Sequence, residues 1–421
     1  MKADRPLLML VSARWWPLSA RLSAALLRHG CRVEAVCPAQ HPITRVRGIG
    51  RVHPYTGVDS LASLRRALLE SRPDRVIPCD DGCAAQLHEL HRREPALRAL
   101  IERSLGPARS LDIVSSRFAS LRAAADAGIT VPLTIRIDSR DDLVAWHSHV
   151  ATTGVMKVNG SCGGEGVRVC RTLAESVAAW QELRAGTTSA FAWKRLLIDR
   201  DPLALWVHSS QRQPEITVQR FVSGRPANSM LACRDGKVLS QVVVSVVASG
   251  GAMGAATVIR PMHNAAIERA GERLAQALQL SGFVGLDFMI EDGTDEPYFI
   301  EINPRCTQLG HLELAGRGSL AGAYCADLLG QTASTPQAIV AETIALFPQA
   351  QSSALGRSYI DAAHHDVPWD EPDLVRELLA RPWPQRQWAS RIYHALRSPS
   401  RPEDVAYEAI MPRIGETQSP V

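Results

Sequence analysis

A lysine followed by four glycines is the first group of residues able to do chemistry. In VMKVNGSCGGEGVRVC an apolar run ends at Lys157, and Gly160, Gly163, Gly164 and Gly166 follow before a second apolar run. Glycines let the backbone turn several N–H groups toward a polyphosphate, while the lysine adds a positive charge. In a Walker A loop the lysine instead follows the glycines and a helix begins at once. We therefore predict a phosphate-binding loop between two strands; the alternative is a flexible glycine hairpin.

A second group lies on two apolar segments, GFVGLDFMI and YFIEINP, which predict an antiparallel hairpin with a short loop. If Ile290 faces Tyr298, antiparallel pairing puts Asp287 opposite Glu301. Asn303 then shares the face of Glu301, because side chains two residues apart point the same way.

The opposed carboxylates predict a metal site. Two like charges on neighbouring strands repel each other unless a cation lies between them. Asp287, Glu301 and Asn303 offer only oxygen ligands, which suit one or two Mg²⁺ ions, or Mn²⁺, much better than Zn²⁺. Arg305 follows two residues later and is suited to neutralise charge on a transferred phosphoryl or acyl group. The alternative, a solvated acidic face, fits poorly because both strands are otherwise apolar.

The segments around these groups predict an α/β protein. Residues 6–40 alternate as strand, helix and strand, and a later strand, DRVIPCD, leads into a helix that begins near Asp80 or Asp81. Residues 1–113 are therefore expected to form a parallel α/β domain. No GxGxxG follows its first strand, so a dinucleotide site has no support there.

A second domain is expected at residues 114–335, with a lid subdomain at about 150–217 that contains the glycine loop. The segment SSRFASLRAAADAG predicts a capped helix at its start. Residues 336–421, richer in Pro, His and Trp, are expected to form a small C-terminal appendage.

Composition excludes several classes of protein. The 421 residues carry a net charge of +4 and are 46% apolar, which is ordinary for a globular chain. The basic residues are dispersed and no apolar run is long enough for a membrane span, so we expect neither nucleic acid nor a membrane as a partner. The nine cysteines contain no CxxC pair, which favours reduced thiols in a cytoplasmic protein. Only four residues are lysines, so Lys157 in a motif stands out.

Together, in this order, the two motifs resemble the ATP-grasp superfamily of carboxylate–amine ligases, which includes biotin carboxylases, D-alanine–D-alanine ligases and L-amino acid ligases. The resemblance implies that a pre-ATP-grasp α/β domain precedes an ATP-grasp domain, and that ATP and Mg²⁺ are bound. It implies that Asp287, Glu301 and Asn303 hold Mg²⁺ and that Lys157 and Arg305 are catalytic. ITVQRFVSG resembles the hinge that receives the adenine, formed by Gln219, Arg220, Phe221 and Val222.

The activity implied is formation of an acyl phosphate from a carboxylate and ATP, followed by attack of an amine that gives an amide, ADP and phosphate. Arg117 stands where many relatives have a lysine that touches ATP, and Arg keeps the charge but changes the geometry. Arg260 and His311 lie in segments where relatives hold their small-molecule substrates. A homodimer is the commonest oligomeric expectation. A biotin-carboxylase-like carboxylase and a non-catalytic nucleotide-binding regulatory protein are the alternatives.

Overall fold

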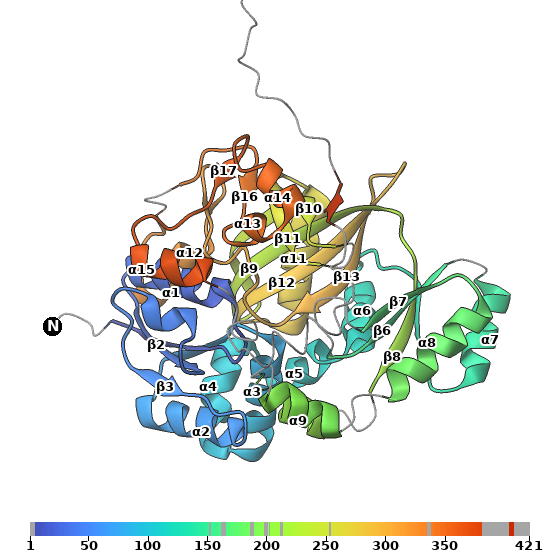
Figure 1. The fold of residues 1–421 in the computed structure, drawn as a ribbon, viewed down its shortest axis with the longest axis horizontal. Helices are drawn as coiled ribbons and strands as arrows, with labels where there is room; N and C mark the ends of the chain where they lie inside the picture. The colour runs from blue at the N-terminus through green and yellow to red at the C-terminus, as the bar shows by residue number, and fades with distance from the viewer. Residues whose placement is uncertain are drawn as a thin grey trace, which may run out of the picture.

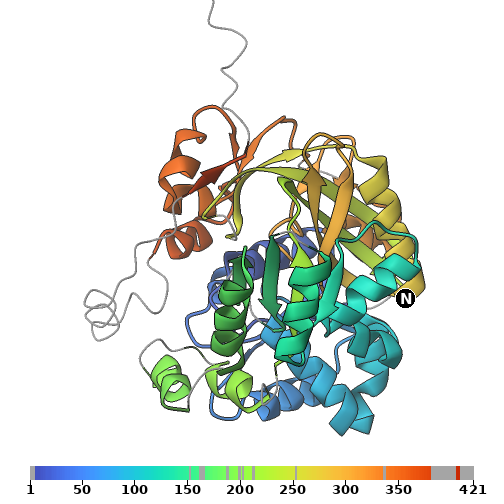
Figure 2. The same cartoon turned by 90° about the vertical axis from the view of Figure 1, so that its right-hand side faces the viewer.

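The computed structural model contains three β-sheets of four or more strands, arranged around one central region (Figure 1). It describes residues 5–150, 153–160, 166–185, 189–197, 201, 203–210, 214–251, 254–334, 338–380 and 404–407. In the view turned by 90°, the four-stranded sheet formed within residues 134–220 lies nearest the viewer, below the eight-stranded sheet (Figure 2).

The N-terminal sheet is parallel, with the strand order β3-β2-β1-β4. Of its two inner strands, β1 is buried along its whole length, which agrees with the continuous apolar sequence of this strand. The strands are β1 (Leu7–Val11), β2 (Arg32–Cys37), β3 (Val52–Pro54) and β4 (Arg75–Pro78). The helices of this region are α1 (Pro17–Arg28), the 3₁₀ helix η1 (Pro42–Arg45), α2 (Ser60–Ser71), α3 (Asp81–Arg93), α4 (Pro95–Leu105) and α5 (Ala108–Val114).

Helix α3 begins where the sequence predicts it. The carboxylate of Asp80 accepts a hydrogen bond of 2.8 Å from the backbone N–H of Cys83, so Asp80 is the N-cap. Asp81, the first residue of the helix, is therefore left to make another contact.

The second region starts with α6 (Arg117–Asp126), which Ser116 caps by accepting from the N–H of Ala119. A four-stranded antiparallel sheet follows, with the order β5-β8-β6-β7. Its strands are β5 (Thr134–Arg136), β6 (Gly154–Val158), β7 (Val167–Cys170) and β8 (Ile216–Arg220). The helices here are α7 (Arg140–His149), α8 (Leu173–Ala185), α9 (Ser189–Leu197) and α10 (Ala204–Ser210).

The large sheet has eight strands in the described part of the chain, in the order β13-β12-β9-β10-β11-β16-β17, with β18 paired to β10. The strands are β9 (Gly224–Arg234), β10 (Lys237–Ser249), β11 (Ala256–Pro261), β12 (Gly282–Glu291), β13 (Pro297–Asn303), β16 (Ile344–Ala345), β17 (His364–His365) and β18 (Val405–Ala406). A short hairpin is formed by β14 (Glu313–Leu314) and β15 (Gly318–Ser319). The remaining helices are α11 (Ala265–Leu278), α12 (Leu320–Leu329), α13 (Gln349–Ser352), α14 (Ala354–Ser358) and α15 (Pro372–Leu379).

The segment predicted as an appendage contributes strands to this sheet. β16 pairs with β11, and β18 pairs with β10 at Ala248 and Ser249. Among the described residues, no helix is both long enough and apolar enough to cross a membrane.

The β12–β13 hairpin has the predicted pair of acids but a different register at its loop. Asp287 lies opposite Glu301, as predicted. Ile290, however, faces Pro297 rather than Tyr298, and the loop is one residue shorter at each end than expected. A β-bulge at Ile300 takes up the one-residue difference and brings Glu301 back opposite Asp287.

One hydrophobic core joins the N-terminal sheet to the large sheet. It contains Leu8 and Leu10 of β1, Met230 of β9, Val244 of β10 and Tyr324 of α12, all buried. Beside this core, the backbone N–H of Cys306 donates to the carbonyl of Pro78 at 3.2 Å. The loop after the hairpin is thus fixed to the carboxyl end of β4, the end of a parallel sheet at which ligands usually bind.

The close contact between β9 and β12 can be tested by its effect on the stability of the protein. A Cβ at Gly224 would overlap the backbone carbonyl of Ile290, whereas a Cβ at Gly250 would meet no atom of the described residues within 4 Å. Gly224→Ala is expected to lower the free energy of unfolding by about 2 kcal/mol, because backbone has to move to relieve the overlap. Gly250→Ala should change it by less than about 0.5 kcal/mol. Equal free energies of unfolding for the two variants, measured with urea, would contradict the close contact between Gly224 and the carbonyl of Ile290.

Candidate active site

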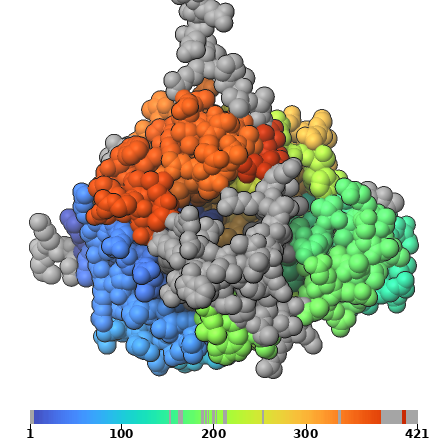
Figure 3. All heavy atoms as spheres, in the orientation of Figure 1, coloured from blue at the N-terminus to red at the C-terminus, as the bar shows by residue number. Residues whose placement is uncertain are grey.

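A cavity of about 960 Å³ lies where the three sheets meet. In the space-filling view the surface is hollowed between the blue N-terminal part, the orange C-terminal part and the green part (Figure 3). Most of the site residues predicted in the sequence analysis line this cavity although they are far apart in sequence. They are Arg117, Lys157, Gly160, Gln219, Arg220, Phe221, Val222, Asp287, Glu301, Asn303 and Arg305.

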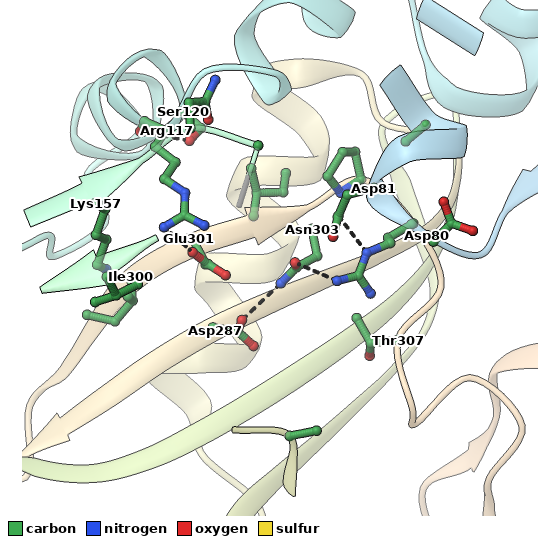
Figure 4. A pocket seen from close by; sticks show the side chains of 18 of the residues that line it. Asp80, Asp81, Arg117, Ser120, Lys157, Asp287, Ile300, Glu301, Asn303 and Thr307 are labelled. Carbon is green, nitrogen blue, oxygen red and sulfur yellow. Dashed lines mark hydrogen bonds and ion pairs between the residues drawn. The ribbon is translucent and has the colours of Figure 1, made fainter. Parts of the chain in front are cut away.

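Asp287 is held by two amides. Asn228 Nδ2 on β9 donates to its carboxylate at 2.6 Å. Asn303 Nδ2 on β13 donates to it at 2.9 Å (Figure 4). Burial, and then the negative charge of Glu301, raises the pKa of Asp287 to about 6. The predicted repulsion between the opposed acids is therefore present in the structure.

Glu301 is paired with Arg117, whose guanidinium Nη1 lies 3.1 Å from Glu301 Oε2. Arg117 is the first residue of α6, directly after the Ser116 cap. The Ser116 hydroxyl donates to the carboxylate of Glu215 at 2.8 Å, which ties the start of α6 to the residue before β8. This arrangement fixes the arginine that the sequence analysis marked as an unusual replacement for lysine.

Lys157 lies at the end of β6 with only 8% of its surface exposed. Its Nζ donates to Gln219 Oε1 at 2.8 Å, and Gln219 Nε2 donates to Thr134 Oγ1 at 3.1 Å. Burial lowers the pKa of Lys157 to about 8, although Glu301 opposes this effect. Gln219 thus positions the lysine, and its predicted contact with the adenine stays a prediction.

Arg305 connects the hairpin with the N-terminal region. Its Nε donates to Asp81 Oδ1 at 2.6 Å, and its Nη2 donates to Asn303 Oδ1 at 3.3 Å (Figure 4). Burial alone would raise the pKa of Asp81, but the adjacent charge and hydrogen bond of Arg305 lower it below the ordinary value. The guanidinium is therefore held by a charged partner on one side, next to the opposed acids.

The residues present fit a hard divalent cation. Two carboxylates and one amide oxygen come together on one hairpin, and burial of the acid pair is unfavourable without a positive charge. No cluster of three or more His, Cys, Asp or Glu side chains able to hold a metal occurs in the described part of the chain, as is usual where phosphate oxygens and water complete a magnesium site. The eight cysteines of the described ranges are free and buried.

The predicted hinge borders the cavity after β8. Phe221 is 41% exposed, whereas Val222 is buried. The guanidinium of Arg220 pairs with Glu291 at 3.2 Å and stacks 5.0 Å from the centre of the Tyr298 ring. Phe221 and Val222 are thus the apolar hinge side chains on the cavity wall.

The glycine loop is described only at its two ends. Gly160 has a φ of 75°, a conformation that favours glycine, and it lines the cavity. The carbonyl of Gly166 accepts from the N–H of Val158 at 3.0 Å and closes the base of the loop. Gly163 and Gly164 lie outside the described residues.

Two residues predicted near the substrates do not line the cavity. Arg260 lies on β11 opposite Ser245 of β10. His311 is buried, and its Nε2 lies 2.8 Å from Asp366, which is also paired with Arg21 of α1 at 2.7 Å. His311 therefore helps to join the C-terminal segment to α1, because a buried carboxylate needs more than one partner.

Three residues of the site escaped the sequence analysis as site residues. Asp81 was predicted only as lying near the start of a helix, and its signal was the second acid of the pair after β4. Asn228 and Glu215 gave no signal, because neither the pairing of β9 with β12 nor the contact of β8 with α6 can be read from local spacing.

Comparison with known proteins finds one matching family model and many solved structures with a similar fold. Residues 204–308 match the family model described as an ATP-grasp domain. No curated protein matches the sequence of the chain.

Three solved structures illustrate the likeness. N5-carboxyaminoimidazole synthetase from Staphylococcus aureus complexed with ADP has 12% identity and a TM-score of 0.57, over 79% of this chain and 80% of that one. N5-carboxyaminoimidazole ribonucleotide synthetase from Thermus thermophilus has 17% identity and a TM-score of 0.54, over 78% and 79%. The biotin carboxylase domain of Hydrogenobacter thermophilus 2-oxoglutarate carboxylase, with MgADP, ADP and bicarbonate, has 12% identity and a TM-score of 0.57, over 80% and 72%. At such identities the likeness is one of fold.

The raised pKa of Asp287 predicts a titration that can be observed directly. In the metal-free protein its carboxyl should take up a proton near pH 6, because burial and Glu301 disfavour the charged form. The folded state then binds this proton more tightly than the unfolded chain. Ionisation of this carboxyl therefore lowers the free energy of unfolding as the pH rises from about 4 to about 6. Above that range the whole loss is present.

Carbon-13 NMR of aspartate-labelled protein measures this pKa, with Asp287→Asn to assign the resonance. A raised carboxyl pKa that disappears in the variant is the expected result. If every aspartate of the wild-type protein titrates below about pH 5, the electrostatic account of the acid pair is incorrect.

Proposed function

Because this chain contains an ATP-grasp domain behind a parallel α/β domain, we propose that it is an ATP- and Mg²⁺-dependent carboxylate–amine ligase. In this reaction a carboxylate oxygen attacks the γ-phosphorus of ATP, the bond to the β-phosphate oxygen breaks, and ADP leaves. The amine nitrogen then attacks the carbonyl carbon of the acyl phosphate. Phosphate leaves, the nitrogen loses a proton, and an amide remains.

One observation carries the proposal most strongly. The cavity combines the acids Asp287 and Glu301 with three cationic side chains, Arg117, Lys157 and Arg305, that come from separate segments. Transfer of a phosphoryl group requires positioning and neutralisation of charge rather than a protein nucleophile. That is the chemistry this set of side chains supplies.

Nucleotide phosphates are assigned to Lys157, Arg117 and the glycine loop. Lys157 is kept in place by Gln219, and burial, which lowers its pKa, leaves its positive charge poorly solvated. A phosphate group beside it compensates for this loss and favours the charged form. Phe221 and Val222 are assigned to the adenine, because they form the apolar wall of the hinge.

The metal is assigned to Asp287, Glu301 and Asn303. When bound, Mg²⁺ offsets negative charge on the phosphates. Asn228 and Asn303 orient the carboxylate of Asp287, and Arg117 orients that of Glu301. These contacts keep the ligands ready without a large rearrangement.

Arg305 is assigned to the reacting groups. Asp81 and Asn303 hold its guanidinium, so the group keeps one orientation beside the proposed metal ligands. A preorganised cation at this position stabilises the charge that develops on the transferred phosphoryl group and on the acyl oxygen. The two substrates are small molecules, as for the enzymes named in the structural comparisons, and a cytoplasmic location remains an expectation.

Lys157→Ala is expected to weaken nucleotide binding about tenfold or more, because a buried charge assigned to the phosphates is lost. Lys237→Ala removes an exposed lysine at the first position of β10, and it should leave the affinity unchanged. Isothermal titration calorimetry with Mg·ADP measures both variants. Equal affinity in the wild type and in Lys157→Ala would contradict the phosphate assignment.

Glu301→Gln is expected to lower Mg²⁺-dependent ADP formation by a factor of about 100 or more, because one anionic metal ligand becomes neutral. Glu296→Gln, an exposed change in the loop of the same hairpin, should retain full activity. A coupled assay of ADP release over a matrix of amino acids and carboxylic acids, singly and in pairs, gives the rates. Full activity of Glu301→Gln with a substrate pair would eliminate the metal assignment.

A further inference from the structure

The part of the cavity next to the N-terminal sheet lies where the strand order of that sheet reverses. In the order β3-β2-β1-β4, the chain passes from β1 to β2 on one side, whereas the connection from β3 leads to β4 on the other side. Ligands of open parallel sheets usually bind at such a reversal, outside the carboxyl ends of the strands. The loops that follow β1 and β4 line the cavity here with residues 14–16 and 79–82.

Arg14 and Asp81 occupy matching positions in these two loops. Val11 of β1 pairs with Pro78 of β4, and Arg14 and Asp81 each follow three positions later. Both residues line the cavity. Burial raises the pKa of Asp81, but the charges of Arg305 and then of Arg14 lower it below the ordinary value. The two loops therefore present a cation and an anion close to each other.

The backbone of the loop after β1 is held in place. The carboxylate of Asp80, which caps α3, also accepts from the N–H of Ala13 at 2.7 Å. The carbonyl of Arg14 accepts from Nε2 of the buried His41 at 3.0 Å. This Nε2 carries the proton, because Nδ1 of the same ring accepts from the N–H of Ile43 at 3.1 Å. The backbone that carries the Arg14 side chain is thus fixed before a ligand binds.

The side chain of Arg14 is more exposed than the arginines beside the acid pair. It is 33% exposed, compared with 17% for Arg117 and 16% for Arg305. Its Nη2 lies 3.8 Å from Asp201, which is beyond hydrogen-bond distance, and Arg195 holds Asp201 more closely at 2.6 Å. A guanidinium has five N–H donors in a plane that matches a carboxylate, so Arg14 can bind a second anion in addition to Asp201.

Asp81 is the complementary anion. Its side chain is 35% exposed, and its Oδ1 accepts from Nε of Arg305 at 2.6 Å (Figure 4). A carboxylate has about four lone-pair sites, so it can accept from an ammonium group as well. Because the pKa of Asp81 is lowered, the side chain is ionised at neutral pH. An ammonium group bound to Asp81 lies next to Arg305 and therefore next to the reacting groups.

We propose that this part of the cavity binds the amine substrate as an amino acid, with Arg14 holding its carboxylate and Asp81 its ammonium group. A simple amine lacks the charge that Arg14 binds, and a dicarboxylate lacks the charge that Asp81 binds. The ammonium group passes one proton to water before its nitrogen attacks the acyl phosphate. The carboxylate at Arg14 is not activated, so it remains free in the amide product. The inference rests on the proposed ligase function, because it names the class of the amine substrate.

The test measures binding of small molecules to the full-length protein saturated with Mg·ADP. Isothermal titration calorimetry is carried out with the standard L-amino acids and with succinate and glutarate, two dicarboxylates without an amine. At least one amino acid should bind about tenfold or more tightly than both dicarboxylates. The primary amide of that amino acid keeps the ammonium group but loses the carboxylate charge, and it should bind about tenfold or more weakly than the acid.

Variants of Arg14 assign this difference to the guanidinium. Arg14→Gln should weaken binding of the amino acid about tenfold or more and change binding of its amide less than about twofold, because only the acid has the charge that Arg14 contacts. Arg14→Lys, which keeps the charge but not the planar group, should restore part of the preference for the acid. Arg45→Gln makes the same change at an exposed position of η1 and should behave as the wild type.

Binding of Mg·ADP to the same samples separates the two claims. Four results would overturn the inference while Mg·ADP still binds: equal affinity for the acid and its amide, an unchanged preference in Arg14→Gln, tighter binding of a dicarboxylate than of every amino acid, or binding of no amino acid. Failure of the wild type to bind Mg·ADP would instead overturn the proposed function.

Discussion

The partial burial of two carboxylates on neighbouring strands is the constraint on which the rest of the site depends. Asp287 and Glu301 face each other across β12 and β13 in a cavity that raises the pKa of Asp287. Such a pair is costly in a folded protein unless cations and hydrogen-bond donors surround it. The structure supplies these from several elements: Arg117 from α6, Asn228 from β9, and Lys157 at the end of β6. The partners of the acid pair therefore come from α6 and from two of the sheets.

The same requirement links the two ends of the site to the fold. Arg305 leaves the hairpin and pairs with Asp81 at the start of α3, while the backbone of Cys306 bonds to the end of β4. The N-terminal region thus has a direct part in orienting Arg305 beside the proposed metal ligands. Helix α3 then continues along the wall of the cavity. A shared core of β1, β9, β10 and α12 keeps this geometry rigid.

Local patterns in the sequence predicted the fold class, both motifs and the opposition of Asp287 and Glu301, because alternation and glycine spacing report on neighbouring residues. The loop register was wrong at Ile290, since a bulge at Ile300 has no clear sequence signal. Asn228 was missed because it reaches Asp287 through pairing of strands that are distant in the chain. For the same reason the pairing of His311 with Asp366, which leaves His311 outside the cavity lining, could not be predicted. Long-range pairing, rather than local propensity, determined each of these outcomes.

The central claim is that a carboxylate is activated by phosphoryl transfer, and oxygen isotopes test it most directly. A mixture of amino acids with ¹⁸O in their carboxyl groups, incubated with the protein, ATP and Mg²⁺, would release phosphate for mass spectrometry. The account predicts phosphate that is two mass units heavier, because one carboxylate oxygen stays on the phosphorus when the amide forms. Release of ADP with phosphate that contains no ¹⁸O would mean that water attacks ATP instead, and it would contradict an acyl phosphate intermediate.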